Sequence, residues 1–455
     1  MKLSTHTIVV PDYPAKNEYL LYHTRTQGMV KVNQDLKNVI DNFNSLSDDL
    51  KTPHQDNLDA LYKMQILIKN DNEDKERLKD FLQQLKFSIR KKSFPVTILT
   101  TYSCNFKCVY CFEESSRAHQ NMDEHVQKGT IEWMKEKIEQ DGYQQLYLNF
   151  YGGEPLINKA AIDYIVPEMK SWCQERGVKF KFMLQTNGYF LTPELVDKYL
   201  SMGLDQVRIS VDGLREVHDK NRPLRGGGGT FDRVMKNIVD SVEKVKIGIS
   251  TSYEKDDITH IEQLMNYFEE LGILNKLGAF LFSPIHPSLG PDGDLGKLQR
   301  IECMCNHEDT YLANAATKIR SLMEQKNLPI KGGMAVSACP LVSEHSGMTI
   351  DQEGKLYKCN SMLGHKDLAI GSVFHERFNT KQKEFRDLDV WQQCPQDCTY
   401  LPMCSGGCRL MSFLETKSFN APACKKPYLN RMAPEFIKKE YEELMSKKNY
   451  TNFIK

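Results

Sequence analysis

The sequence lacks three features that would place it in a broad class at once. Its 60 basic and 60 acidic side chains cancel, and it has no long basic tract, so we expect no electrostatic surface for nucleic acid or a charged membrane. No run reaches the roughly eighteen apolar residues of a membrane span, and the N-terminus lacks the apolar core of a signal peptide. We therefore expect a cytoplasmic protein that recognises its partners by shape and local contacts.

Cysteine, in contrast, is abundant, with 13 among 455 residues. The cytosolic thiol pool keeps disulfides reduced, so metal binding explains these thiols better. Ten of them fall into two tight groups, one made of Cys104, Cys108 and Cys111 and the other running from Cys339 to Cys424. The remaining three are Cys173, Cys303 and Cys305.

Residues 1–90 look separate from the rest of the chain, whose length suggests two or three domains. A strand is expected near residues 6–10, and two apolar runs at 19–23 and 29–32 predict a hairpin. Helical patterns follow, and the charged stretch at 69–79 is typical of the solvated face of a helix. The pattern predicts a small α+β module.

From residue 94 onward, strands alternate with amphipathic helices. The six expected strands are residues 95–101, 146–150, 179–184, 206–211, 246–252 and 278–282. Repeated βα units imply an α/β fold with a parallel sheet and right-handed crossovers, in which chemistry collects at the carboxyl ends of the strands. Because polar motifs follow the first four strands, we expect four loops to converge at one rim. After about residue 330 turns dominate, and bound metal is the expected source of stability.

The first cysteine group lies in the sequence Cys104-Asn-Phe-Lys-Cys108-Val-Tyr-Cys111, directly after the first expected strand. Iron–sulfur clusters normally take four cysteines, so three on one loop suggest an iron whose last site is filled by a substrate or cofactor. The alternative is a zinc knuckle without its fourth ligand, but no histidine lies at zinc-finger spacing.

This C-x3-C-x2-C motif, with Tyr110 before its last cysteine, resembles the signature of the radical S-adenosylmethionine (SAM) superfamily. The resemblance implies a partial (β/α)6 TIM-type barrel and a 4Fe–4S cluster on Cys104, Cys108 and Cys111. In that family SAM chelates the open iron, and its reductive cleavage releases a 5′-deoxyadenosyl radical that abstracts hydrogen from the substrate. The protein positions the reactants and excludes competing reactions.

Two further motifs carry the same resemblance. The YGGEP sequence is similar to the family's GGEP element, which implies that Gly152 and Gly153 let the backbone approach the SAM amino group and that Glu154 accepts a hydrogen bond from it. The QTNG sequence matches a segment near the ribose, which makes Asn187 a candidate contact. Each motif alone could be simple turn chemistry, but their order after successive strands favours the family.

The ISVDG sequence and the residues after it resemble the peptide-modifying branch of the superfamily. By that resemblance Ser210 and Arg222 are candidates to hold the SAM carboxylate, a role that suits a hydroxyl and a guanidinium. The glycine run at residues 226–229 is either a flexible loop or a lid over the substrate, and the loop is the preferred interpretation.

The second cysteine group is similar in spacing to the SPASM domain, a C-terminal extension with two auxiliary iron–sulfur clusters. One departure is a C-x3-C pair where the family has C-x2-C. By that resemblance one cluster takes Cys339, Cys359 and Cys408, and the other takes Cys394, Cys398, Cys404 and Cys424. The first cluster is thus short of a ligand: its iron could stay open for substrate, or be closed by His345, Cys303 or Cys305. For all seven cysteines, the alternative to iron–sulfur clusters is structural zinc. His345 could instead be an ordinary surface histidine. Cys303 and Cys305 could instead be buried thiols or donate hydrogen to a radical.

The resemblance covers residues 95–430 and implies a peptide or protein substrate. One candidate reaction is maturation of a ribosomally made peptide, chiefly by a thioether link from a cysteine sulfur to carbon, with epimerisation or carbon–carbon cross-linking as variants. The other is oxidation of a sulfatase's active-site residue to formylglycine. Peptide maturation is favoured because about ninety residues precede the SAM motif, and because Asn360, where sulfatase-maturing relatives carry an acid, cannot take a proton at neutral pH.

Three domains are therefore expected. Residues 1–90 loosely resemble a winged-helix module that captures a leader peptide as an added strand, although a packing extension is the alternative. Residues 91–310 form the radical SAM barrel, and residues 311–455 the SPASM domain with a C-terminal helix. Beyond the peptide, we expect an external electron donor such as flavodoxin or ferredoxin. A protein whose clusters only carry electrons would not need the SAM motifs.

Overall fold

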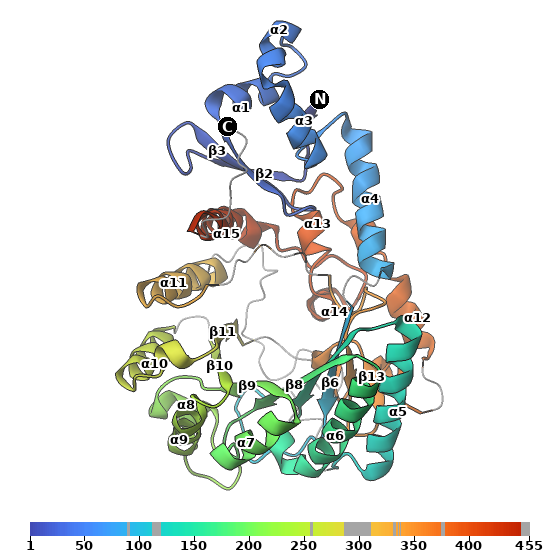
Figure 1. The fold of residues 1–455 in the computed structure, drawn as a ribbon, viewed down its shortest axis with the longest axis vertical. Coiled ribbons are helices and arrows are strands. Elements are labelled where there is room, and N and C mark those ends of the chain that lie inside the picture. Colours follow the sequence, from blue (N-terminus) through green and yellow to red (C-terminus); the bar gives the residue numbers. More distant parts are fainter. Residues whose placement is uncertain are drawn as a thin grey trace.

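The computed structural model describes residues 1–88, 92–111, 120–254, 258–285, 311–330, 334, 336, 338–374 and 378–446. Its central sheet contains six parallel strands that lie in the sheet in the order of the chain (Figure 1). These strands are β6 (Ser93–Leu99), β7 (Gln145–Tyr151), β8 (Lys179–Thr186), β9 (Leu204–Ser210), β10 (Lys246–Tyr253) and β11 (Ala279–Pro284). In the described residues β11 pairs only with β10, so the barrel stays open and the predicted partial barrel is confirmed.

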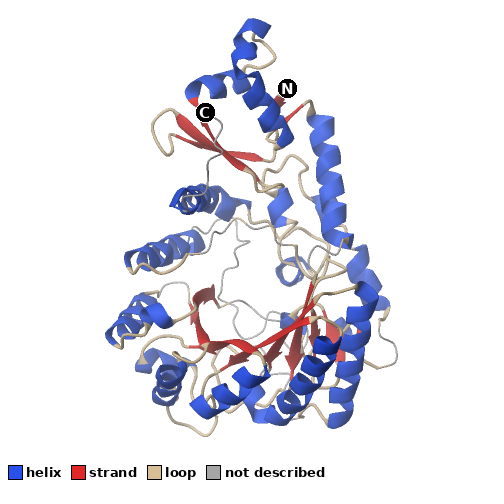
Figure 2. Ribbon diagram, in the orientation of Figure 1, coloured by secondary structure: helices blue, strands red, loops and turns tan. Residues whose placement is uncertain are grey.

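Helices cover the outer side of this sheet, as Figure 2 shows. They are α5 (Glu124–Asp141), α6 (Lys159–Glu175), α7 (Pro193–Met202), α8 (Arg215–Asn221), α9 (Phe231–Ser241), α10 (Thr259–Glu270) and α11 (Tyr311–Gln325). Side-chain oxygens of Asp123 and Thr192 accept the N–H groups of Val126 and Leu195 and so begin α5 and α7 where the strand-to-helix loops end.

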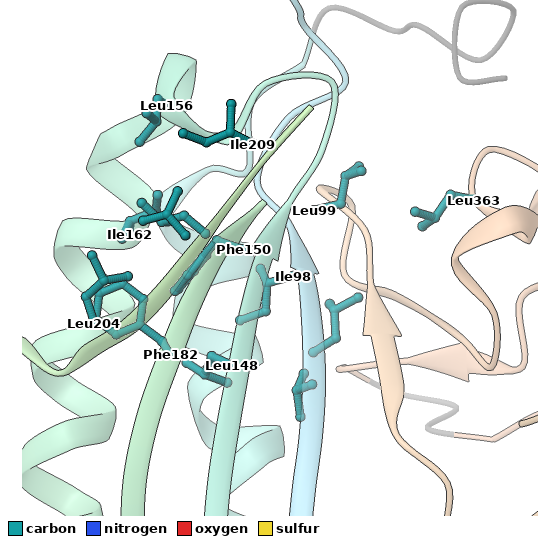
Figure 3. Packing of buried hydrophobic residues seen from close by; sticks show 14 of the residues in the cluster. Ile98, Leu99, Leu148, Phe150, Leu156, Ile162, Phe182, Leu204, Ile209 and Leu363 are labelled. Carbon is teal, nitrogen blue, oxygen red and sulfur yellow. The ribbon is translucent and has the colours of Figure 1, made fainter. Parts of the chain in front are cut away.

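The core lies between the sheet and these helices. Figure 3 shows Phe150 of β7 and Phe182 of β8 beside Ile162 of α6. The two phenylalanine rings meet edge to face with centroids 5.8 Å apart. Burial of each such side chain contributes about 1.5–3 kcal/mol, so the strands are held firmly and their carboxyl ends form a rigid rim.

The C-terminal region extends the barrel sheet. Strand β12 (Met348–Ile350) lies parallel to β6 with Ile350 opposite Ile98, and β13 (Lys355–Tyr357) and β14 (Gly371–Ser372) follow in antiparallel order. The sequence pattern had indicated only turns here, so this pairing is a difference from expectation. The α-helices of this C-terminal region are α12 (Thr380–Asp387), α13 (Leu401–Cys404), α14 (Arg409–Thr416) and α15 (Lys426–Ser446).

The N-terminal module lies at the far end of the molecule from the barrel (Figure 1). Its strands are β1 (Lys2–Leu3), β2 (Thr7–Pro11), β3 (Glu18–His23), β4 (Met29–Asn33) and β5 (Leu67–Ile68), and its helices are α1 (Gln34–Asp41), α2 (Asp48–Lys51), α3 (Gln55–Lys63) and α4 (Asp71–Phe87). The predicted strand and hairpin are β2, β3 and β4, which form one antiparallel sheet.

This module packs on the C-terminal region. The Thr24 hydroxyl donates to the Thr399 carbonyl at 2.7 Å, and leucines of α4 share a buried cluster with Trp391. No helix in the described ranges is both long and apolar enough to cross a lipid bilayer.

Candidate active site

The three cysteines that follow β6 lie on one loop, and we call them the barrel cysteines: Cys104, Cys108 and Cys111. This loop is hydrogen-bonded along its length to the segment that follows α8. Lys107 N–H donates to the Pro223 carbonyl at 2.8 Å, and Arg225 N–H donates to the Asn105 carbonyl at 2.8 Å. These backbone hydrogen bonds help to define the conformation of the loop.

The two glycines after β7 support the barrel cysteine loop from behind. Gly153 N–H donates to the Thr101 carbonyl at 3.0 Å, and a Cβ on Gly153 would lie 2.4 Å from the Tyr102 carbonyl oxygen. Gly152 has φ +154°, and a Cβ there would lie 2.5 Å from the Thr101 oxygen. Glycine is required at both positions because no other residue allows this approach. The contact made is with the cysteine loop, a role that the sequence did not predict.

Glu154 is fully buried, and its carboxylate joins two loops. Oε1 accepts the Leu156 N–H at 3.0 Å and the Thr186 hydroxyl at 2.7 Å, and Oε2 accepts the Asn187 N–H at 2.8 Å. Burial raises the pKa of Glu154, and these hydrogen bonds oppose the rise. The Glu154 oxygens accept from donors of the protein, and Glu154 is not among the residues that line the pocket, so its contact with the SAM amino group stays a prediction.

The barrel cysteines line a pocket of ≈ 220 Å³ at the carboxyl ends of the strands. The pocket also contains the other residues predicted to contact SAM, apart from Glu154. Its lining is Cys104, Phe106, Cys108, Tyr110, Cys111, Tyr151, Gly152, Gly153, Gln185, Thr186, Asn187, Ser210, Arg222, Ser250 and Ser252. Sequence reasoning missed Ser250 and Ser252, although two hydroxyls spaced by two residues at the end of a strand must point to the same face.

Arg222 is held in a buried polar network with Tyr110 and Asp212. The guanidinium donates to the Tyr110 hydroxyl, which donates to an Asp212 carboxylate oxygen, and the Arg222 and Asp212 side chains are 3.8 Å apart. Burial opposes the charge on Arg222, but the neighbouring anionic groups outweigh it, so its pKa is raised. Asp212 is a further residue whose role sequence reasoning missed, although it lies within the quoted ISVDG motif.

The Asn187 side chain contacts the barrel cysteine loop. Its Nδ2 lies 3.8 Å from Cys104 Sγ and donates to the Asn105 side chain at 2.8 Å. Phe106 N–H is 3.4 Å from the same sulfur. Such N–H donors stabilise a thiolate, the form that binds metal.

The seven C-terminal cysteines were predicted to form two sets. The first C-terminal group is Cys339, Cys359 and Cys408, and the second C-terminal group is Cys394, Cys398, Cys404 and Cys424. Burial raises the pKa of Cys339 to about 11, with Cys408 and Cys359 adding to the rise. Burial likewise raises the pKa of Cys394 to about 11, with Cys404, Cys398 and Cys424 adding to it. The thiols that act on Cys339 belong to its predicted set, and those that act on Cys394 belong to the other predicted set.

His345, Cys303 and Cys305 were predicted as possible further ligands of the first C-terminal group. His345 directs Nδ1 toward Asp141 of α5, with 3.5 Å between Nδ1 and the carboxylate Oδ2. Cys303 and Cys305 lie outside the described residues. Cys173 is buried in α6 among the barrel core, where burial raises its pKa to about 11.

No three histidine, cysteine, aspartate or glutamate side chains in the described ranges converge as ligands of a single metal ion would. The ligands of an iron–sulfur cluster are arranged differently, because the thiolates surround a group of several irons and not one ion. The barrel cysteines are compatible with that arrangement. All three line one pocket, and two N–H groups are directed at the Cys104 sulfur.

A partial barrel with three thiols at its rim defines a cofactor-dependent α/β enzyme. Residues 98–268 match the model described as the radical SAM superfamily. This part of the chain is a radical SAM domain. The superfamily implies a 4Fe–4S cluster and SAM, which the pocket residues fit.

Comparison with curated proteins gives distant relatives. An Fe-coproporphyrin III synthase from Methanosarcina barkeri is 29% identical over 189 residues, which are 41% of this chain and 43% of that protein. A cysteine-type anaerobic sulfatase-maturating enzyme from Clostridium novyi is 24% identical over 331 residues, 68% of this chain and 85% of that enzyme. The chain thus matches less than half the length of the first relative and most of the second.

Solved structures share the fold. The anSMEcpe protein with bound AdoMet has a TM-score of 0.59 at 18% identity and covers 76% of this chain and 98% of its own. Streptococcus suis SuiB bound to its precursor peptide SuiA has a TM-score of 0.53 at 14% identity and covers 93% of this chain and 98% of its own. Coverage of 93% is more than the residues after the N-terminal module could supply, so part of that module shares the fold too.

Proposed function

We propose that this enzyme modifies a ribosomally made peptide, and that the modification is a thioether link from a cysteine sulfur to a carbon of another residue. The observation that carries the proposal is the pocket of ≈ 220 Å³ in which three thiols meet the loops of four strands, on a chain that also has an N-terminal module. Relatives whose names specify peptide or protein maturation support a peptide substrate.

The barrel cysteines are proposed to hold the SAM-binding 4Fe–4S cluster, which supplies the 5′-deoxyadenosyl radical when SAM is bound. Ser210 and Arg222 are proposed to bind the SAM carboxylate. Arg222 would stay oriented by Tyr110 and Asp212 while doing so. Gly152, Gly153 and Glu154 are assigned a positioning role, since they fix the loops that carry Cys104 and Asn187.

The two C-terminal groups are proposed to hold two auxiliary 4Fe–4S clusters. Support comes from the thiols that raise the pKa of Cys339 and of Cys394, because in each case they belong to the same predicted group. An external donor such as flavodoxin or ferredoxin is proposed to supply electrons, and the boundaries near residues 90 and 310 remain our proposed domain limits.

The N-terminal module is proposed to bind the leader of the substrate peptide along strand β4. In the described residues β4 pairs only with β3, so its other edge can accept an added strand. Val30 and Val32 face the module core, which fixes the strand and leaves Met29 and Lys31 on the opposite face.

Sulfatase maturation is the second candidate, because several relatives carry that name. The region around Asn360 opposes it. The Asn360 side-chain oxygen accepts the Thr349 hydroxyl at 2.5 Å, so an amide tied to β12 stands where a base is needed.

Reconstituted enzyme tests the proposal. A variant with Cys104→Ala, Cys108→Ala and Cys111→Ala is expected to lose reductive formation of 5′-deoxyadenosine, whereas Cys173→Ala, a buried thiol in α6, should retain it. If the triple variant still cleaves SAM, the assignment of the barrel cysteines is wrong.

The product distinguishes the candidate reactions. Co-expression with short peptides encoded beside the gene, followed by mass spectrometry, should show loss of two hydrogen atoms with sulfur retained. A carbon–carbon link gives the same mass change but leaves every thiol free to alkylate, and epimerisation changes no mass. Loss of sulfur from a sulfatase substrate would instead establish formylglycine formation.

A further inference from the structure

Arg409 is a buried cation in the C-terminal region. It directly follows Cys408 at the start of α14, is 0% exposed, and is the largest of the fully buried side chains in the described residues. A buried guanidinium is expensive unless its donors and its charge are both satisfied. The surroundings of Arg409 supply acceptors for its N–H donors, but they do not supply a carboxylate to balance its charge.

The donors of Arg409 are directed at backbone carbonyls. Nη1 donates to the carbonyls of Phe419 at 3.0 Å and Ala421 at 2.6 Å. Nη2 donates to the Gly406 carbonyl, and Gly407 accepts more weakly. The guanidinium therefore fastens the turn between Cys404 and Cys408 to the segment that leads to Cys424, and its planar fork is what allows one side chain to do so.

The turn around Arg409 is built for this contact. Gly406 and Gly407 both have φ +81°, a conformation that glycine adopts without strain. A Cβ on Gly407 would lie 2.0 Å from the Ala423 oxygen, so this turn must pack directly against the backbone beside Cys424.

The charge of Arg409 has no carboxylate partner. No aspartate or glutamate oxygen in the described part of the chain is recorded within 4.0 Å of its guanidinium, although 27 such ion pairs occur elsewhere in that part. The groups whose ionised forms would favour its charge are four thiols, two from each C-terminal group: Cys339, Cys408, Cys394 and Cys404. Carbonyl dipoles offset only part of the cost of a buried charge. An anionic group bound by these thiols would supply the missing counter-charge.

We propose that Arg409 is the shared counter-ion of the two auxiliary clusters and sets the reduction potential of both. This inference rests on the proposed cluster assignment and goes beyond the choice of ligands. A thiolate-bound cluster is anionic and gains one negative charge on reduction, so a nearby fixed cation stabilises the reduced form and raises the potential. Because one arginine interacts with both sets of thiols, its loss should shift both clusters in the same direction.

The test separates the effect of the Arg409 charge from that of its hydrogen bonds, in the full-length chain with its C-terminal clusters loaded. Arg409→Gln removes the charge and keeps some donors, whereas Arg409→Lys keeps the charge and loses the fork. Both variants are made in the background with the barrel cysteines replaced by alanine, so that only C-terminal clusters are observed. The matched control is Lys417→Gln, an exposed cation at the far end of α14.

The measurement is a redox titration followed by electron paramagnetic resonance on anaerobically reconstituted protein. Arg409→Gln is expected to lower the reduction constant of both clusters at least about tenfold, equal to about 59 mV for one electron, while Arg409→Lys and Lys417→Gln shift it less than threefold. Unchanged potentials in Arg409→Gln would overturn the proposal, as would a shift in Arg409→Lys equal to that in Arg409→Gln.

Failure to load iron is also informative. If Arg409→Gln does not load but Arg409→Lys does, with potentials like the parent, the charge is required and the proposal holds. If neither loads, the carbonyl contacts are what the site needs and the counter-ion role is wrong. If the parent itself holds no iron in its C-terminal groups, the cluster assignment fails independently of Arg409.

Discussion

The barrel cysteines and the C-terminal groups place thiols in very different surroundings. The barrel cysteine loop follows a buried strand. It is hydrogen-bonded on one side to residues 221–225 and on the other to Gly153 and Glu154. The C-terminal groups lie on turns between strands of two or three residues and short helices. We therefore expect the sheet to form the first site without its cofactor, and the second site to depend on what it binds.

Removal of iron should show this contrast most strongly. Structural metal sites contribute on the order of 10 kcal/mol to folding. We expect amide hydrogen exchange in residues 339–424 to accelerate about 1000-fold or more in the apo-protein, which corresponds to about 4 kcal/mol, while strands β6 to β10 keep their protection. Equal acceleration in both regions would show that the barrel also needs its cofactor to fold.

A single methyl group should disrupt the preformed site. Gly153→Ala places a Cβ 2.4 Å from the Tyr102 carbonyl oxygen, a clash with backbone that no side-chain movement relieves. We expect a loss of at least about 3 kcal/mol of stability and, through displacement of Cys104, about 100-fold slower formation of 5′-deoxyadenosine. The matched control is Gly226→Ala, which has no heavy atom within 4 Å of the new Cβ and should leave both quantities unchanged.

Glu154→Gln should have a smaller effect at the same rim. One oxygen becomes an NH2 group that faces the Thr186 hydroxyl or the Asn187 N–H, so a buried donor loses its acceptor. We expect a cost of about 2 kcal/mol in urea unfolding and roughly tenfold slower SAM cleavage. Glu168→Gln, on the exposed face of α6, is the control. Normal stability with a large loss of SAM affinity would instead mean that Glu154 contacts the cofactor.

Sequence patterns located the barrel accurately because its signals are local. The expected strand at 179–184 is Lys179–Thr186 in the structure, and the one at 246–252 is Lys246–Tyr253, since β-branched and apolar runs bounded by turn residues mark both ends. Pairing of β12 with β6 could not be predicted in this way. It joins Ile350 to Ile98 across most of the chain, and three residues carry no periodic signal.

The site shows the same limit. Motif spacing identified which residues gather at the rim, and all but one of the SAM-contact candidates line the pocket. The direction of each side chain was not predictable. Glu154 points into the protein because a buried carboxylate needs donors, and Thr186 and Asn187 supply them from a neighbouring strand. Likewise, nothing in the sequence indicated that Arg409 would be buried between two sets of thiols.

Low pH should reduce the stability of the N-terminal module through a group that neither cysteine region contains. This is the smallest of the predicted effects. His23 lies in the module core, where its Nδ1 accepts the Thr26 N–H at 3.3 Å and Nε2 is 3.3 Å from the Ser4 hydroxyl, which in turn donates to Asp74. Burial, assisted by Arg25, lowers the pKa of His23 to about 3 from an ordinary value of 6.5.

The sign of the pH effect follows from that shift. Between pH 6.5 and 3 the unfolded chain binds a proton at His23 that the folded module excludes, so stability is complete above pH 6.5 and falls as the pH is lowered. At pH 5.5 the expected loss is about 1.4 kcal/mol relative to neutral pH. His23→Gln removes this titration, so its stability should change less between the two pH values than that of the wild type. A brief proteolysis pulse along a urea series, with detection of peptides from residues 1–88, measures the difference. An identical pH dependence in both proteins would show that His23 is not the group whose protonation destabilises the module.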